Sequence, residues 1–281
     1  MSESLQTGQF YGRPDNKTEV DGVVLTEVVH TQGRKLPQHT HESAYFGLLL
    51  SGGYAEQFSH SVAEYKPLTI GFHPPAMTHR DEIGAQGSRM FTIELRDAFL
   101  QRMRPYLTAP KFTPEIDGSD MAWLGLKLYR AFRGGDASEL VVDSLCGEML
   151  EQAGKIATTE DSGRTAWMKR ALELLHGSFR ESLTLEGIAR QVNVHPIHLS
   201  RVFRRTQACS LGEYVNRLRV QYACRQMGKE QIPLSELAAI AGFADQSHFG
   251  RVCKSLTGST PGKLRQVLCP APAPSAAAPP A

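Results

Sequence analysis

The sequence predicts a multidomain protein with an N-terminal β-barrel or jelly-roll, two linking helices, and a C-terminal all-α domain that contains two helix-turn-helix units. Three observations predict this architecture: short β-rich segments near the start, two amphipathic segments in the middle, and one pattern that occurs twice near the end. The chain has 281 residues, which is long enough for two cores of ordinary size.

The N-terminal part is expected to be built from strands. Turn residues separate its short segments, which are rich in β-branched and aromatic side chains. Several short strands at this spacing favour a barrel or sandwich over alternating βα units, and we assign this domain to residues 1–110. The expected strands are 23–29, 45–50, 53–58, 68–72 and 89–95.

Two helices are expected in the linking region, 111–157, at 120–132 and 137–156. The second is amphipathic, and its apolar face either packs on the barrel or forms a dimer interface. A polar, glycine-containing linker is expected at 158–164. The predicted face of the second helix contains Leu140, Val141, Ser144, Leu145, Glu148, Met149 and Gln152.

The C-terminal part, 165–266, contains the repeated pattern. Residues 188–194 recur at 237–243, and a basic amphipathic stretch follows each copy. In each copy a small residue is followed four positions later by Asn193 or Gly242, which tolerate the left-handed backbone of a sharp turn. The two copies therefore predict two helix-turn-helix units, each able to place one helix in a DNA major groove.

The residues between the copies predict a rigid spacer. Ser210 and Glu213 fit a capping box, and a helix over 211–227 is expected to be about 25 Å long. With its flanking turns, this helix holds the two reading helices about 34 Å apart, one turn of the DNA duplex. One chain is therefore expected to read two adjacent major-groove segments.

The C-terminal segment resembles the AraC/XylS family of bacterial transcription regulators. The motifs that carry the resemblance are 183–205, 214–219, 240–249 and 257–261. The resemblance implies reading helices at about 196–205 and 246–256, a homodimer formed through the second linking helix, and RNA polymerase as a partner. Three residues depart from what this domain leads us to expect: Gly187 and Gly250 lie inside expected helices, and Leu264 replaces an aromatic residue.

Helical spacing assigns the outward faces of the two reading helices. Arg201 and Arg251 are expected to read guanine, because a guanidinium group can meet O6 and N7 together, and Gln246 is expected to read adenine. Ile197 is placed to pack on a thymine methyl group, and the other cations are expected to meet phosphates. The candidate DNA contacts are Ile197, His198, Ser200, Arg201, Arg204, Arg205, Gln246, Ser247, Arg251 and Lys254.

Three histidines stand out in the N-terminal domain. His39 and His41 lie two positions apart on an expected strand, so their side chains point the same way, and His79 is able to add a third imidazole. Structural histidines, a pocket for an organic ligand and a metal site all remain open interpretations of this group.

A second resemblance narrows these interpretations. Residues 37–41, the strand after them and 51–53 resemble the first motif of a cupin-like effector domain, and 74–79 resemble the second. Metal cupins carry a glutamate four or five positions after the second histidine, where this chain has Tyr45 and Phe46. We therefore expect an effector pocket formed by His39, His41, Tyr45, Phe46 and His79, and no metal or cofactor.

Charge and composition agree with this division. Residues 1–163 have a net charge of −7, and residues 164–265 have a net charge of +9. Only the basic half is expected to seek phosphate. The five scattered cysteines include no CxxC pair, which predicts reduced thiols and disfavours both a zinc finger and the DNA-repair branch of the family. A tail is expected at 267–281, with disorder from 270 onward.

These observations predict a bacterial transcription regulator that binds specific double-stranded DNA and is controlled by a small-molecule effector. We expect no enzyme activity. No apolar run is long enough for a membrane span and the start lacks a secretory signal, so we expect a cytoplasmic protein without a membrane partner. Two alternatives remain: a metal-dependent cupin enzyme fused to a DNA-binding domain, and a dimeric DNA-binding regulator that needs no effector.

Overall fold

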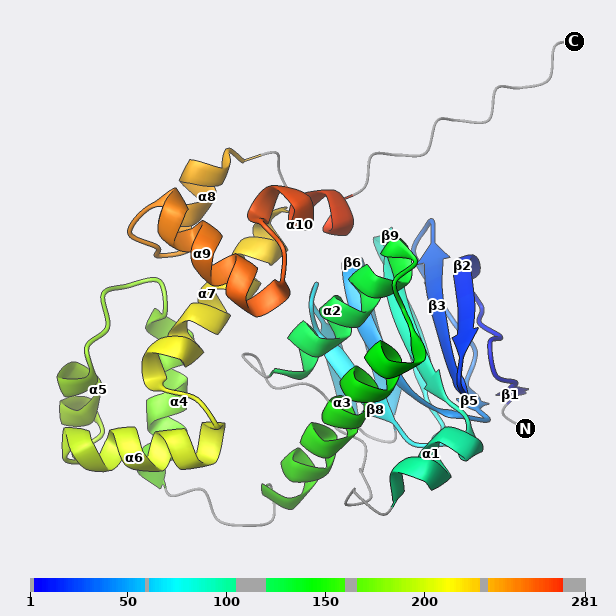
Figure 1. Cartoon of the computed structure of the whole chain (residues 1–281), viewed down its shortest axis with the longest axis horizontal. Coiled ribbons are helices and arrows are strands. Elements are labelled where there is room, and N and C mark those ends of the chain that lie inside the picture. Colours follow the sequence, from blue (N-terminus) through cyan, green and yellow to red (C-terminus); the bar gives the residue numbers. More distant parts are fainter. Residues whose placement is uncertain (1–2, 59–60, 105–119, 160–165, 228–231, 270–281) are drawn as a thin grey trace, which may run out of the picture.

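The structure, a computed structural model, describes residues 3–58, 61–104, 120–159, 166–227 and 232–269. Figure 1 shows a sheet at one side of the molecule, two helices across one face of it, and a group of further helices beside them. This agrees with the expected order of a sheet-rich N-terminal region and a helical C-terminal region. Every helix in the described segments is too short or too polar to cross a lipid bilayer.

The N-terminal region forms one large sheet and one small one. Seven strands pair in the order β2-β3-β9-β6-β7, with β4 added to β9 and β8 added to β6, while β1 and β5 form a separate parallel pair. Among the described residues no ladder joins β2 to β7, so the sheet is not closed and the predicted barrel or jelly-roll is not confirmed. The strands are β1 (Glu3–Leu5), β2 (Arg13–Val20), β3 (Val23–His30), β4 (Arg34–Lys35), β5 (His39–His41), β6 (Ala44–Phe58), β7 (Ser61–Tyr65), β8 (Ile70–His73) and β9 (Arg80–Leu95).

The two expected strands at 45–50 and 53–58 are in fact one long strand, β6. The glycines between them form an irregularity inside the strand rather than a turn. Gly52 has a φ of +86°, and the pairing of β6 with β9 shifts register between Leu49 and Ser51 and again between Gly52 and Tyr54. Such bulges bend a strand and increase its twist. β6 and β9 are therefore long, bent strands that pair along most of their length.

Three helices follow the sheet: α1 (Asp97–Met103), α2 (Met121–Gly134) and α3 (Glu139–Thr159). α2 contacts β6 and β8, and α3 packs on α2 (Figure 1). Within the chain the predicted face of α3 is buried only in part, because Met149 is fully buried while Leu140 is 80% exposed. The residues that α3 buries follow a different helical stripe, namely Val142, Cys146, Met149, Leu150 and Ala153.

Seven helices make up the described C-terminal region. The expected linker lies mostly outside the described residues, because only its first two positions belong to α3. The predicted start of the tail at residue 267 is too early, because α10 continues to Leu268. The side chains of Leu264 and Leu268 are both buried. The helices are α4 (Ala166–Ser178), α5 (Leu185–Gln191), α6 (Pro196–Gln207), α7 (Leu211–Met227), α8 (Leu234–Ile240), α9 (Gln246–Thr257) and α10 (Pro261–Leu268).

These helices belong to two different hydrophobic cores. A first cluster is built from α4, α5, α6 and the N-terminal half of α7, where it includes Tyr214 and Leu218. The C-terminal half of α7 joins a second, larger cluster together with α8, α9 and α10, and that cluster also contains the sheet, α2 and α3. Val220 and Phe249, for example, share this core with Phe46 and Leu128. The second helix-turn-helix unit is thus packed into the core of the N-terminal region.

Polar contacts reinforce this junction. The Arg130 guanidinium of α2 donates to the Thr257 carbonyl at the end of α9, at 3.0 Å. From β9, Arg89 donates to the carbonyls of Val267 and Leu268 in α10, at 3.4 Å each. α7 is held as well, because Arg217 forms an ion pair of 2.8 Å with Asp120, which precedes α2.

Candidate nucleic-acid interface and candidate ligand site

The two helix-turn-helix units have the same turn. Asn193 has a φ of +55° and Gly242 a φ of +85°, which confirms the left-handed backbone predicted at both positions. The residue after each turn donates a backbone hydrogen bond to the small residue before it, from Val194 to Ala189 and from Phe243 to Ala238, both at 3.0 Å. A Cβ atom at Gly242 would lie 2.4 Å from the Arg180 carbonyl oxygen, so this position requires glycine.

The reading helices α6 and α9 have the same length and begin three residues after Asn193 and four residues after Gly242. Each has 12 residues, and each starts with a side-chain cap. His195 Nδ1 accepts a hydrogen bond from the Ile197 N–H at 3.3 Å, and Asp245 accepts one from the His248 N–H at 2.7 Å. One stripe of each helix is buried, including Phe203 in α6 and Phe249 in α9. The opposite stripe of each helix faces outward.

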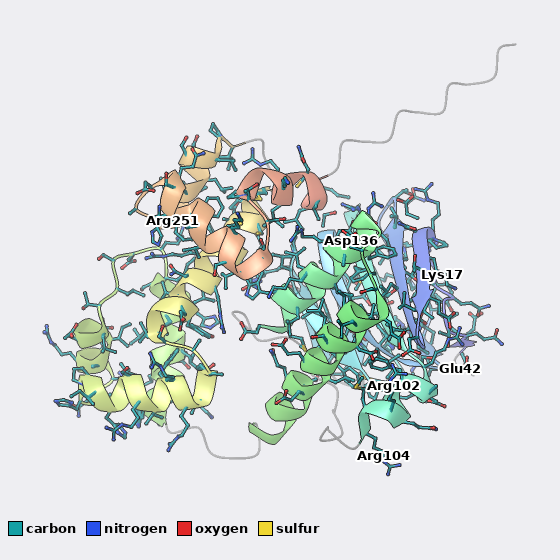
Figure 2. The ribbon with its side chains drawn as sticks, in the orientation of Figure 1. Lys17, Glu42, Arg102, Arg104, Asp136 and Arg251 are labelled. Atoms are coloured by element: carbon teal, nitrogen blue, oxygen red, sulfur yellow. The ribbon has the colours of Figure 1, made fainter. Side chains whose placement is uncertain are left out.

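All ten of the predicted DNA contacts lie on the exposed surface of α6 and α9. Ile197 is 63% exposed, so its apolar side chain is available for contact with a partner. The ring of His198 packs beside that of Trp167, with 5.5 Å between the ring centroids. Figure 2 shows Arg251 on the side of α9 that is turned away from the sheet. An open groove of about 580 Å³ on the surface of α6 is lined by Leu185, Ile197, Ser200, Arg201, Arg204 and Arg205.

The spacer between the units has the predicted helix and cap. α7 spans Leu211–Met227, and the capping box is confirmed. The Ser210 backbone N–H donates to Glu213 at 2.7 Å, and the Glu213 N–H donates to the Ser210 hydroxyl at 3.3 Å. These bonds satisfy backbone groups that a helix N-terminus otherwise leaves without partners.

The three predicted histidines meet inside the N-terminal region. β5 carries His39 and His41, and His39 forms an isolated bridge with His79, which lies just before β9. One ring nitrogen from each of the three lies within 4.8 Å of the others, and all three side chains are buried. Tyr45 joins them, with its ring 4.7 Å from that of His41. Phe46 does not: it points to the opposite face of β6 and packs on Phe72 in the main core.

Hydrogen bonds fix the orientation of two imidazoles. His39 Nδ1 lies 2.9 Å from the Pro37 carbonyl, and His79 Nδ1 lies 3.1 Å from the Met77 carbonyl. A carbonyl can only accept, so Nδ1 is the donor in both rings and the lone pair of each neutral ring is on Nε2. Both Nε2 atoms face the Asp81 carboxylate, at 3.7 Å from His39 and 3.9 Å from His79.

Burial controls the charge of this cluster. It lowers the pKa of His41 to about 2, with a further contribution from the neighbouring imidazoles, and it lowers the pKa of His79 to about 4. Burial also lowers the pKa of His39. For Asp81, burial and then the charge of Glu56 raise the pKa to about 8. The three imidazoles are therefore neutral at pH 7, with lone pairs available to a ligand.

Sequence reasoning missed the carboxylates and one histidine of this cluster. Asp81 enters from β9, and Glu56 enters from β6, where it lies 2.7 Å from His73 of the neighbouring β8. Asp81 lies two residues after His79 on the same strand face, which is the one signal that could have identified it. Glu56 and His73 lie far from the histidine motifs in the sequence, and only the pairing of β6 with β8 and β9 brings them close.

The cavity beside the histidines is small. Its volume is about 40 Å³, and its lining includes His39, His41, Tyr45, Tyr54 and Asp81. A water molecule occupies about 30 Å³ of liquid, whereas pockets for organic ligands are about 300–1,000 Å³. The cavity in this conformation therefore fits a water molecule or an ion.

Comparisons with known proteins agree on the C-terminal region. Residues 188–266 match the model of a helix-turn-helix domain. The chain is 30% identical over 86 residues to the probable transcription factor PqrA of Proteus vulgaris, a match that covers 31% of this chain and 70% of PqrA. The chain belongs to the AraC family of transcription regulators.

Other relatives of this AraC-family chain match over a smaller share of their length. It is 29% identical over 110 residues to the bifunctional transcriptional activator/DNA repair enzyme AdaA of Bacillus subtilis, which covers 39% of this chain and 52% of AdaA. The chain thus spans about half of that relative. Among solved structures, ToxT of Vibrio cholerae is 12% identical, with coverage of 87% of this chain and 99% of ToxT and a TM-score of 0.39.

Proposed function

We propose that this AraC-family regulator reads two adjacent major-groove segments with α6 and α9, and that a ligand bound in the N-terminal region controls it. The observation that carries the DNA-reading half is the equivalence of Arg201 and Arg251. Each is the sixth residue of a 12-residue helix, and each is exposed opposite a buried stripe. Two equivalent guanidinium groups on two equivalent helices suit the reading of two similar base-pair steps.

The other exposed residues divide into two roles. Gln246, at the start of α9, is placed to read adenine, and Ile197, at the start of α6, is placed to meet a thymine methyl group. Arg204, Arg205 and Lys254 lie nearer the ends of their helices and suit phosphate contacts, which fix position without reading sequence. The remaining candidates are His198, Ser200 and Ser247.

Control by a ligand is supported by the shared core. The second helix-turn-helix unit packs in one hydrophobic cluster with the sheet and α2, so a change in the sheet reaches α9 through packed side chains. A ligand that favours one arrangement by a few kcal/mol is sufficient to change DNA affinity. The cavity of about 40 Å³ favours a ligand no larger than an ion.

We propose a homodimer and RNA polymerase as further partners. The assignment rests on the family, and for the dimer also on the outer surface of α3, where Leu140 is 80% exposed. On the basis of the family we also propose that residues 1–110 contain the ligand-binding region and that residues 165–266 contain the DNA-binding region. The third possibility, a dimer that needs no ligand, predicts equal operator affinity whatever is added to the protein.

Selection from randomised duplexes, followed by affinity measurements on the recovered site, tests the DNA-reading half. We expect Arg201→Ala and Arg251→Ala each to weaken operator binding by about 1–3 kcal/mol and to relax specificity at one position. Lys254→Ala is expected to weaken binding to all DNA sequences equally. It should also lower the slope of log affinity against log salt concentration by about 1.

Lys169→Ala is the matched control, because Lys169 is an exposed cation on α4, outside both reading helices. Its removal changes net charge by the same amount and is expected to leave specificity unchanged. The proposal is wrong if Arg201→Ala and Arg251→Ala bind the selected site as tightly and as selectively as Lys169→Ala does.

A further inference from the structure

A second cleft lies where the sheet and α2 meet α10, apart from the histidine cluster. It is open and has a volume of about 350 Å³, whereas the cavity beside the histidines has about 40 Å³. A volume of this size is within the range of pockets for small organic ligands. β9 and α2 supply one side of the cleft, and the segment at 259–267 supplies the other. The lining includes Arg89, Arg130, Arg133, Ser259, Lys263 and Gln266.

Positive side-chain charge exceeds negative charge in this cleft. Four of the lining residues are cations, and none of the described lining residues is acidic. The buried carboxylate of Glu27 binds two of the cations, Arg89 and Arg133. Within the described segments, no carboxylate pairs with Arg130 or Lys263. Four cations and one carboxylate leave three positive charges, and a bound anion would relieve their mutual repulsion.

Arg89 forms the fixed part of the cleft. Its guanidinium group donates to Glu27 and also to the carbonyls of Val267 and Leu268, at 3.4 Å each. Arg89 thus joins β9 to α10 and has its donors occupied. We assign it a positioning role and not a direct contact with a ligand.

The other three cations have donors to spare. Arg130 and Arg133 each use one terminal nitrogen in hydrogen bonds with described residues, on the Thr257 carbonyl at 3.0 Å and on Glu27 at 3.1 Å. Lys263 is exposed, and its ammonium group bonds no described residue. A guanidinium group has five N–H donors and an ammonium group has three. Most donors of these three side chains are therefore available to a ligand.

We propose that the cleft binds a small organic phosphate, held by Arg130, Arg133 and Lys263. A phosphate monoester carries a charge of about −1.5 to −2 at pH 7, so it offsets most of the excess positive charge, whereas a monocarboxylate offsets one unit. Guanidinium groups also meet phosphate oxygens with paired, charge-assisted hydrogen bonds. Ser259 and Gln266 add neutral polar groups for the organic part of the ligand.

The position of the cleft favours a small molecule over the DNA backbone as the source of the phosphate. Arg251 lies on the side of α9 that is turned away from the sheet (Figure 2), whereas β9 and α2 build one side of the cleft. DNA on the exposed face of α9 therefore lies away from the cleft. A ligand in the cleft would connect α2 with α10. The inference goes beyond the proposed function, because it concerns a different site.

Isothermal titration calorimetry of the full chain with inorganic pyrophosphate tests the proposal, because pyrophosphate presents the phosphate charge without a particular organic part. We expect saturable binding of one pyrophosphate per chain, weaker binding of inorganic phosphate, and no detectable binding of acetate. Arg130→Gln and Lys263→Gln each remove one cation. Each should lower the pyrophosphate affinity at least about tenfold, as expected from the loss of one hydrogen bond to a charged group.

Lys169→Gln is the matched control, because it removes the same charge from α4, outside the cleft, and its pyrophosphate affinity should equal that of the wild type. Circular dichroism reports whether each variant folds, and the exposed Lys263 decides if Arg130→Gln does not fold. On the selected operator, Lys263→Gln should bind as tightly as Lys169→Gln.

Three results would overturn the proposal. The first is no saturable pyrophosphate binding, or acetate binding of equal strength. The second is an unchanged pyrophosphate affinity in Lys263→Gln. The third is a loss of operator affinity in Lys263→Gln beyond that of Lys169→Gln, which would assign the cleft to the DNA backbone.

Discussion

Replacement of Gly242 by alanine tests the steric explanation of the second helix-turn-helix unit. Gly242 has a φ of +85°, a region that costs a residue with a Cβ atom about 1–2 kcal/mol. The added Cβ would also lie 2.4 Å from the oxygen, 2.7 Å from Cα and 2.8 Å from the carbonyl carbon of Arg180. These are backbone atoms, so no side-chain rotation relieves the contact, and overpacking of this kind costs about 1–3 kcal/mol.

Together these two terms predict a loss of about 3 kcal/mol for Gly242→Ala. Gly250→Ala is the matched control in the same unit, because Gly250 lies inside α9 and a Cβ there meets no atom within 4 Å. Alanine at this position should stabilise the chain by about 0.5–1 kcal/mol. Urea unfolding of the full chain, followed by circular dichroism, measures both.

The reasoning is refuted if the two variants lose stability equally, or if Gly242→Ala stays within about 0.5 kcal/mol of the wild type. Operator affinity of Gly250→Ala gives a second result from the same protein. If the α9 backbone approaches DNA closely at Gly250, affinity falls while stability rises. If the glycine only weakens the helix, affinity is maintained.

Two further predictions concern buried carboxylates. Glu27 is 1% exposed and accepts hydrogen bonds from Arg89, Tyr129 and Arg133, so Glu27→Ala should cost about 2–3 kcal/mol in thermal unfolding. Glu19 forms an exposed pair with Arg96, so Glu19→Ala should cost under about 1 kcal/mol. Equal losses in the two variants would contradict this reasoning. Burial raises the pKa of Glu94 from 4.5 to about 7, against the opposing hydrogen bonds from the Gly8 N–H. The folded state thus holds this proton more tightly than the unfolded state, and its stabilisation is lost as pH rises from about 4.5 through 7. Glu94→Gln should therefore gain stability relative to the wild type as pH rises across that window. If the stability difference between the two proteins does not change with pH, Glu94 is not the source of the pH dependence.

Most of the C-terminal region could be predicted because its signals are local. The left-handed turns at Asn193 and Gly242, the capping box at Ser210 and the outward face of α6 all follow from residues close in sequence. The buried face of α3 was harder to predict from the sequence, because several apolar stripes were possible. Packing on α2 selected the stripe that includes Val142.

The sheet was harder to predict for physical reasons that are visible in its strands. β2 was missed because seven of its eight residues are exposed and the eighth is only half-buried, so the strand carries no apolar alternation. The glycines inside β6 resembled a turn and instead form a bulge. The cluster around His79 depends on strand pairing between distant segments, and a pattern in one segment cannot reveal a carboxylate supplied by another.

The division of α7 between two cores attaches the two reading helices to the N-terminal region in different ways. α9 shares a hydrophobic core with the sheet and α2, whereas α6 packs in a separate core with the N-terminal half of α7. If α6 and its core move relative to the sheet, the separation of the two reading helices along the duplex changes. Such a change would determine which spacing between half-sites the regulator accepts, while the half-site bound by α9 stays the same.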